Sequence, residues 1–286
     1  MAGVAVASGR IGERVDWRLA APLGLTYLAF FAAPFAILLG ISFYANSDQT
    51  RLGLDSWTKF YGDAFYLMVI FDTLKLGVFA VAATTLLAYP LAVLFRGVGP
   101  RVQRVLIFII LMPLLTSVVI RTFAWIVILA REGVVNQTLM GLGLTVAPLN
   151  LLQTEFGLVI ALTQIEMPLM LLPLLTIMNQ MDQNLVDASR ALGASKWRTF
   201  FQVILPQTLP GWIAGATLVF ASTTTAFISQ SVIGGARLVY LPALIWQQSM
   251  VVYNWPFAAV ASLTLLFTVL AGIMALGWLG RFAKTN

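Results

Sequence analysis

The sequence of 286 residues contains no cysteine and no histidine, and only 10% of its residues are charged. The missing cysteines exclude disulfides and thiolate chemistry, and the missing histidines exclude imidazole catalysis and His-ligated metal sites. An ordinary soluble domain carries about 25% charged residues. Here 60% of the residues are hydrophobic and the mean hydropathy is +0.91. This composition is typical of a protein that crosses a membrane several times.

Acidic residues are scarce as well: there are 11 of them against 17 Lys and Arg, which gives a net charge of +6. In a membrane protein such an excess more often marks cytoplasmic loops than a nucleic-acid site. We therefore expect no nucleic-acid partner. The first 16 residues hold Arg10, Glu13, Arg14 and Asp16 without an apolar core, so they are interpreted as a polar tail rather than a cleavable signal peptide.

Six apolar stretches are long enough to cross a bilayer, because a helix needs about 20 apolar residues to span roughly 30 Å of hydrocarbon. They lie at about residues 19–44, 67–95, 104–130, 156–178, 210–233 and 256–280. The sequence therefore predicts an all-α membrane protein with six transmembrane helices. A single domain, residues 19–280, lies between an N-terminal tail, residues 1–18, and a C-terminal tail, residues 281–286.

The distribution of basic residues predicts the orientation of these spans. With the N-terminus inside, eleven of the 17 basic residues lie in the cytoplasm, four lie outside and two lie within spans. This asymmetry follows the positive-inside rule. Both termini are therefore expected in the cytoplasm, and residues 182–206 belong to the second cytoplasmic loop. The outer connections, residues 45–66 and 131–155, are each expected to hold one short helix.

The second cytoplasmic loop is amphipathic and basic. Read as a helix, residues 185–201 bring these apolar side chains near one another: Leu185, Ala188, Leu192, Trp197, Phe200 and Phe201. Gly193 interrupts the helix, and Pro206 and Pro210 are expected to end one helix and begin the next. On these residues alone, the loop is either an interfacial helix that anchors the chain to the bilayer or a docking element for a soluble partner.

The spacing within this loop resembles the EAA loop of ATP-binding-cassette (ABC) import permeases, in which Glu-Ala-Ala, a glycine and an Ile-x-Leu-Pro ending recur. The corresponding residues here are Asp187, Ala188, Ser189, Gly193, Ala194, Leu205 and Pro206. Asp stands for Glu and Ser stands for the second Ala. Residues 113–129 and 235–263 are similar to the spermidine/putrescine-type group of these permeases, so the resemblance covers most of residues 67–280.

This resemblance implies a type I ABC importer permease fold in a bacterial inner membrane, with a coupling helix that docks on a cytoplasmic ATPase. No G-x-x-x-x-G-K-[ST] loop for binding phosphates occurs in the chain. We therefore expect no catalytic activity and no bound cofactor or metal, with ATP and Mg used by two partner ATPase subunits. A second permease, related but distinct, and a periplasmic binding protein are also implied, with transport by alternating access.

Four ionisable residues lie within the predicted spans, where charges are costly and each is a functional candidate. Asp72 and Lys75 are three residues apart and are expected to neutralise each other. Arg121 lies in a segment with family resemblance and is interpreted as a structural or gating residue. Glu166 lies near the middle of its span. It either pairs with Arg121 or Lys75, or it lines the pathway and attracts a cationic solute.

The fifth predicted span is rich in hydroxyl groups, which can hydrogen-bond to carbonyl groups of their own helix. They belong to Ser222, Thr223, Thr224, Thr225, Ser229 and Ser231. Thr224, Thr225 and Gln230 are further candidates for lining a pathway between two permeases. Polyamine permeases of this type often hold an acidic residue in this region, and none is present here.

The sequence therefore predicts the permease subunit of an ATP-driven importer for a small amine-bearing solute. A polyamine such as spermidine or putrescine is favoured, and γ-aminobutyrate-like or opine-like compounds are alternatives. A secondary transporter working alone would be expected to show inverted repeats with broken helices and would not need a docking loop. An intramembrane enzyme is disfavoured, because histidine, cysteine and any paired carboxylate motif are missing.

Overall fold

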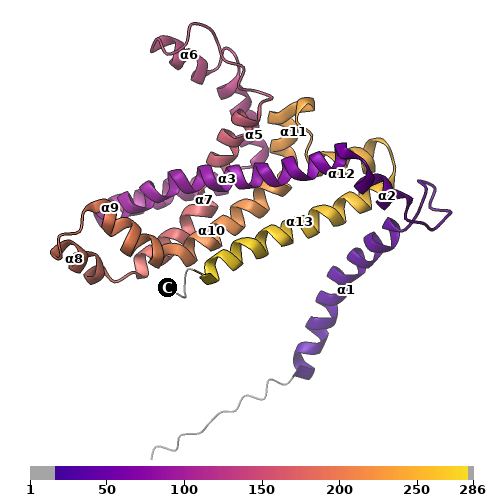
Figure 1. The fold of residues 1–286 in the computed structure, drawn as a ribbon, viewed down its shortest axis with the longest axis horizontal. Helices are drawn as coiled ribbons and strands as arrows, with labels where there is room; N and C mark the ends of the chain where they lie inside the picture. Colours follow the sequence, from indigo (N-terminus) through magenta and orange to yellow (C-terminus); the bar gives the residue numbers. More distant parts are fainter. Residues whose placement is uncertain (1–16, 283–286) are drawn as a thin grey trace, which may run out of the picture.

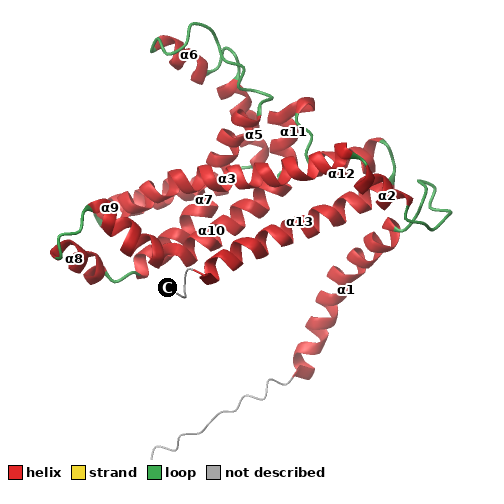
Figure 2. Cartoon of the chain, viewed as in Figure 1, coloured by secondary structure: helices red, strands yellow, loops and turns green. Residues whose placement is uncertain are grey.

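The computed structural model describes residues 17–282, with side chains described for residues 21–278. Within that range the chain is made of helices and loops, and its one extended contact is an isolated bridge between Tyr44 and Leu52 (Figure 2). The all-α prediction is confirmed. Most of the two predicted tails, residues 1–16 and 283–286, lies outside the described residues.

Four long helices form the body of the molecule (Figure 1). They are α3 (Ala64–Gly97), α7 (Glu155–Gln180), α10 (Leu205–Thr225) and α13 (Trp255–Phe282). Each is apolar over at least the length that spans a bilayer. The helices α8 (Gln183–Ala191) and α9 (Lys196–Thr199) lie at one end of this bundle, which we call the loop end.

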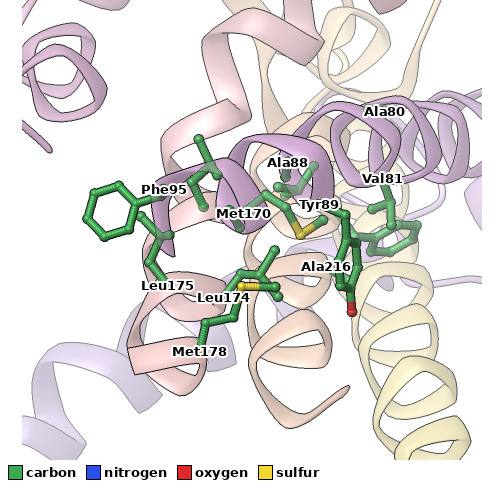
Figure 3. Packing of buried hydrophobic residues seen from close by; sticks show 14 residues of the cluster. Ala80, Val81, Ala88, Tyr89, Phe95, Met170, Leu174, Leu175, Met178 and Ala216 are labelled. Carbon is green, nitrogen blue, oxygen red and sulfur yellow. The ribbon is translucent and has the colours of Figure 1, made fainter. Parts of the chain in front are cut away.

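Small residues let α7 and α10 approach closely. A Cβ atom on Gly211 would lie 2.8 Å from the Pro173 carbonyl oxygen, and one on Gly215 would lie 3.0 Å from the Met170 carbonyl oxygen. Such small-xxx-small spacing is a common way of packing helices in membranes, where van der Waals contact replaces the hydrophobic effect. Around this contact lies the largest apolar cluster, which includes buried alanines of α3 and leucines and methionines of α7 (Figure 3).

Two parts of the chain lie apart from the bundle (Figure 1). The helix α1 (Trp17–Ser42) packs beside α13 but buries none of its most apolar stretch. On the other side, α5 (Val118–Leu129) and α6 (Val134–Gly141) project away from the long helices. The short helices predicted in the two outer connections are confirmed as α2 (Asp55–Gly62) and α6.

Two bent helix pairs occur among the described residues, and one of them corresponds to the span predicted at 104–130. The helix α4 (Pro100–Leu111), with its 3-10 turn, meets α5 and α6 at 100°, and α11 (Phe227–Gly234) meets α12 (Leu241–Trp246) at 88°. The described residues contain five straight spanning helices, or up to seven spans if each bent pair counts as one. The span predicted at 104–130 is a bent pair, because the extended residue Thr116 interrupts the helix. The span predicted at 210–233 corresponds to the straight helix α10, which ends at Thr225, and its last residues belong to α11.

The prediction that Pro206 and Pro210 end one helix and begin the next was also wrong. The helix is continuous from Lys196 to Thr225. A π-helical turn, Phe200–Ile204, precedes Pro206, and the Leu205 amide donates to the carbonyl group of Phe200. A proline is tolerated here because the wider turn does not require its missing N–H group.

Candidate functional site

The coupling segment, residues 182–206, folds into two short helices, each with a capped N-terminus. The Asp182 side chain accepts a hydrogen bond from the backbone N–H of Asn184 (2.9 Å) and so caps α8. The Ser195 hydroxyl group accepts one from the backbone N–H of Arg198 (3.3 Å) and so caps α9. A side-chain cap satisfies a backbone donor that the helix leaves unpaired, and it contributes about 1 kcal/mol. The segment therefore keeps a defined shape at the loop end.

Gly193 makes the turn between α8 and α9. Its φ of +81° lies in the left-handed region, which favours glycine. The Gly193 amide donates to the Arg190 carbonyl group (2.9 Å), and the Ala194 amide donates to the Ser189 carbonyl group (3.1 Å). These two bonds form a Schellman motif at the C-terminus of α8. The predicted interruption of the helix at Gly193 is confirmed.

The serine that departs from the family pattern has a structural partner. The hydroxyl groups of Ser189 and Thr199 lie 3.1 Å apart, and Thr199 is buried, so this contact joins α8 to α9. Leu192 and Trp197 are 88% and 74% exposed, and the Trp197 ring stacks on Phe201. The segment therefore presents exposed apolar side chains.

Seven residues of the coupling segment were predicted to contact an ATPase. Asp187, Ala188, Ser189, Gly193 and Ala194 lie on α8 or in the turn that follows it, whereas Leu205 and Pro206 begin α10. Asp187 lies 3.9 Å from Arg190 one helical turn away, and both side chains are largely exposed. Such an exposed pair contributes little to stability, which leaves the Asp187 carboxylate free to meet a partner.

Glu166 lies near the middle of α7 and is only 5% exposed. The Ser222 hydroxyl of α10 hydrogen-bonds its carboxyl group, and Arg121 of α5 interacts with it electrostatically. None of the ion pairs among the described side chains involves Glu166. Arg121 instead donates to the Ile165 carbonyl oxygen (3.1 Å), and its Nε atom has no partner among the described residues. Among the described side chains, Glu166 therefore interacts electrostatically with Arg121 without forming a direct ion pair.

Lys75 is not available to Glu166 either. Its ammonium group lies 3.0 Å from Asp72, which confirms the predicted pair, and 3.1 Å from Glu155. Sequence reasoning missed Glu155, because the fourth span was expected to begin one residue later. As the first residue of α7, Glu155 joins this helix to α3 through Lys75. The three side chains form a partly exposed structural link at the opposite end of the bundle from α8.

Polar side chains lie around the break between α10 and α11, but two of the predicted pathway residues bond to their own helix. Thr224 and Thr225 donate to the carbonyl groups of Phe220 and Ala221, each at 2.8 Å, so their own helix satisfies them. Gln230 is fully buried, and its amide nitrogen donates to the Thr223 carbonyl oxygen (2.7 Å).

Three buried atoms around this break have no partner among the described residues, namely Gln230 Oε1, Thr223 Oγ1 and Ser231 Oγ. Of the predicted pathway residues, the structure therefore leaves Gln230 with an unpaired acceptor atom and Glu166 with a buried carboxyl group outside any direct ion pair. It adds Thr223, which sequence reasoning missed because a threonine in a helix usually bonds back to its own turn, as Thr224 does.

Comparison with known proteins identifies the family. Residues 85–279 match the family described as "Binding-protein-dependent transport system inner membrane component". The chain is 30% identical over 254 residues to the spermidine/putrescine transport system permease protein PotB of Haemophilus influenzae, covering 87% of this chain and 88% of that protein. The PotB protein of Escherichia coli is 32% identical over 251 residues, with coverages of 86% and 90%.

The fold agrees with this family. A chain in a crystal structure of a bacterial ABC transporter involved in the import of the acidic polysaccharide alginate superimposes with a TM-score of 0.73. The superposition covers 93% of this chain and 96% of the transporter chain, at 18% sequence identity. This agreement supports the type I importer permease fold. Proteins of this family act with a substrate-binding protein and a separate ATPase. The chain belongs to the binding-protein-dependent transport system inner membrane components, and it is a non-catalytic permease subunit of an ABC importer.

Proposed function

We propose that this permease imports a small amine-bearing solute, with a polyamine favoured over γ-aminobutyrate-like and opine-like compounds. The observation that carries the proposal is Glu166, a buried carboxyl group with no ion-pair partner among the described side chains. A carboxylate inside a membrane protein is costly unless it meets a cation or a polar cavity. The similarity to spermidine/putrescine permeases over 86–87% of the chain supports the same class of solute.

The pathway would run past Glu166, Gln230 and Thr223, where α7, α10 and α11 meet. The unpaired buried atoms there are oxygens of the Gln230 amide and the Thr223 hydroxyl group, and Glu166 contributes a buried carboxyl group. Protonated amines are donors only, so they complement such acceptors. The paired hydroxyl groups of Thr224 and Thr225 would shape the pathway without binding the solute.

The coupling segment would dock in a cleft of a cytoplasmic ATPase. Its exposed apolar surface at Leu192, Trp197 and Phe201 supports this role, because an interface needs apolar groups that the bundle does not use. Two ATPase copies would hydrolyse ATP with Mg, and their closure would move the coupling segments of two permeases. The pathway would then open outward to receive solute from the binding protein and reset after hydrolysis.

The second permease would be a related but distinct chain. The helix α1 supports an assembly of two permeases, since large apolar side chains are exposed on all of its faces while its packing within this chain is confined largely to α13. Lipid and a second permease would together cover these faces. A stand-alone secondary transporter would have no use for the capped coupling segment.

The proposed topology, with both termini in the cytoplasm, can be tested by cysteine labelling. The chain has no cysteine of its own, so the background is clean. We expect an impermeant maleimide to label Val146→Cys on intact spheroplasts and to label Leu192→Cys only after permeabilisation. Both positions are highly exposed, and one lies in the outer connection while the other lies in the coupling segment. Labelling of Leu192→Cys from outside would overturn the proposed orientation.

The proposed role of Glu166 predicts a selective loss of transport. In Glu166→Gln the side chain keeps its size and its capacity to bond Ser222, so the main change is the lost charge. We expect polyamine uptake in proteoliposomes to fall on the order of tenfold, which corresponds to about 1.4 kcal/mol. The melting temperature of the complex should change little, because Glu166 forms no direct ion pair and Arg121 keeps its hydrogen bond to the Ile165 carbonyl oxygen.

The matched control is Glu132→Gln, which removes a carboxylate from an exposed position in the outer connection. Its uptake should equal that of the wild type. If Glu166→Gln instead lowers yield and melting temperature while uptake per folded transporter is unchanged, Glu166 is a structural residue and the amine-binding role is wrong.

A further inference from the structure

Three side chains of α3 form polar contacts with one residue at the start of the coupling segment and with two residues of α10 beyond its end. The pairs are Arg96 with Gln183 (2.7 Å), Tyr89 with Thr208 (3.3 Å) and Thr85 with Trp212 (2.8 Å). The three α3 residues are spaced by four and seven positions, so they share one face of the helix. One face of α3 therefore reaches both the start of α8 and the start of α10.

Arg96 makes the contact at the entry to the coupling segment. Its Nη2 atom donates to Gln183 Oε1 at 2.7 Å, and Nη1 lies 3.9 Å from the sulfur of Met181. The short distance is typical of a hydrogen bond with a charged donor, which is roughly twice as strong as a neutral one. Because Gln183 is the first residue of α8, this bond fixes where α8 begins relative to α3.

The exit from the segment is held by buried groups. Tyr89 is 7% exposed and packs edge-to-face against Phe200, and Thr208 is fully buried. The Trp212 indole N–H donates to the Thr85 hydroxyl group, one turn after Thr208 in α10 and one turn before Tyr89 in α3. Since α9 runs without a break into α10, this end of the segment is part of the bundle.

The helix α8 has little else to hold it. Val186 is the only one of its nine residues that is buried, and the helix packs mainly on α9 and the π-helical turn of its own segment. Among the hydrogen bonds of the described residues, Arg96–Gln183 is the side-chain bond that ties α8 to a long helix outside the segment. Without it, α8 would be connected to the bundle at its exit end and through the peptide chain.

We propose that Arg96 is a positioning residue that makes α3 move with α8 when an ATPase displaces the coupling segment. A displacement applied to α8 reaches α10 through the continuous α9–α10 helix and reaches α3 through Arg96. With both connections intact, a displacement of α8 is passed to α3 and α10 together. This proposal rests on the proposed docking of the coupling segment.

The test uses the whole transporter in proteoliposomes, with binding protein, both permeases and the ATPase, and measures uptake and ATP hydrolysis together. In Arg96→Gln, we expect hydrolysis stimulated by loaded binding protein to persist while solute taken up per ATP falls on the order of fivefold, as for the loss of one partly exposed charge-assisted bond. Arg96→Lys keeps a charged donor and should restore much of this ratio.

Two controls separate positioning from general effects. Arg104→Gln removes a charge from the same region, but the Arg104 side chain donates to Pro100 of its own helix, so its ratio should equal that of the wild type. Gln183→Ala should reproduce Arg96→Gln, and the double variant should be no worse than either single variant, because both remove the same bond.

An unchanged ratio in Arg96→Gln, an equal loss in Arg104→Gln, or additive losses in the double variant would overturn the proposal. If Gly193→Asp in the same assay changes neither uptake nor hydrolysis, the segment does not dock on the ATPase, and the proposed role of Arg96 is wrong as well. If that variant is inactive while the ratio in Arg96→Gln is unchanged, docking stands and only the role of Arg96 is wrong.

Discussion

Replacing Gly211 by valine is expected to prevent the long helices from assembling. A Cβ atom at this position would lie 2.8 Å from the Pro173 carbonyl oxygen and 2.9 Å from a side-chain carbon of Ile177. The nearest obstacle is backbone, which cannot rotate away, so α10 would have to separate from α7. Overpacking of this kind costs about 1–3 kcal/mol or more. We expect a large drop in the yield and melting temperature of the detergent-purified complex.

A matched helical glycine provides the control. A Cβ atom on Gly277 of α13 would meet nothing within 4 Å, so Gly277→Val should leave both quantities near those of the wild type. Both variants introduce the same β-branched residue into a helix, which removes intrinsic helix propensity as an explanation. Equal yields and melting temperatures for the two variants would show that α7 and α10 do not rely on this close approach.

Replacing Gly193 by aspartate is expected to abolish ATP-driven uptake while the protein remains in the membrane. The φ of +81° disfavours residues with a side chain, and the cost is about 1 kcal/mol. Because α8 is held by few contacts, this cost falls on the Schellman turn rather than on the bundle. A negative charge is also added beside the proposed docking surface. Uptake and the amount of permease in the membrane, measured together, check this prediction.

Two variants separate the shape of the turn from its charge and position. Gly193→Asn tolerates the left-handed conformation and is neutral, so it should retain part of the uptake. Gly143 also has a positive φ, of +69°, and nothing within 4 Å, but it lies in the outer connection. Gly143→Asp should transport normally. Wild-type uptake by Gly193→Asp would remove the coupling role of the segment.

The sequence predicted the features that depend on local chemistry. Hydropathy identified the four long helices of the bundle, because lipid requires about 20 apolar residues wherever a helix crosses. Gly193 was expected to interrupt the coupling helix, since few other residues adopt a left-handed turn. The pairing of Asp72 with Lys75 followed from their spacing on one helix. Each of these predictions needed only residues close together in the chain.

Features that depend on distant residues were not predictable in this way. An apolar window does not reveal a bend, so residues 104–130 were expected to form one span, and the bent pair α11–α12 was not expected as a span. Glu155 reaches Lys75 from another helix, and Thr223 differs from Thr224 only in what surrounds it in the folded chain. Broken helices had been expected of a secondary transporter, yet this importer permease contains two bent pairs. The coupling segment, rather than helix continuity, therefore distinguishes the two classes.

The position of α1 bears on how the chain is made. This helix precedes every other described helix, and its packing within the chain is largely against α13, the last of them. During synthesis α1 must therefore enter the bilayer on its own hydrophobicity and remain without that contact until residues 255–278 have been translated. Its exposed aromatic and leucine side chains favour its insertion into lipid without a contact to another helix. A ribosome that stalls before α13 would leave α1 inserted without its packing partner.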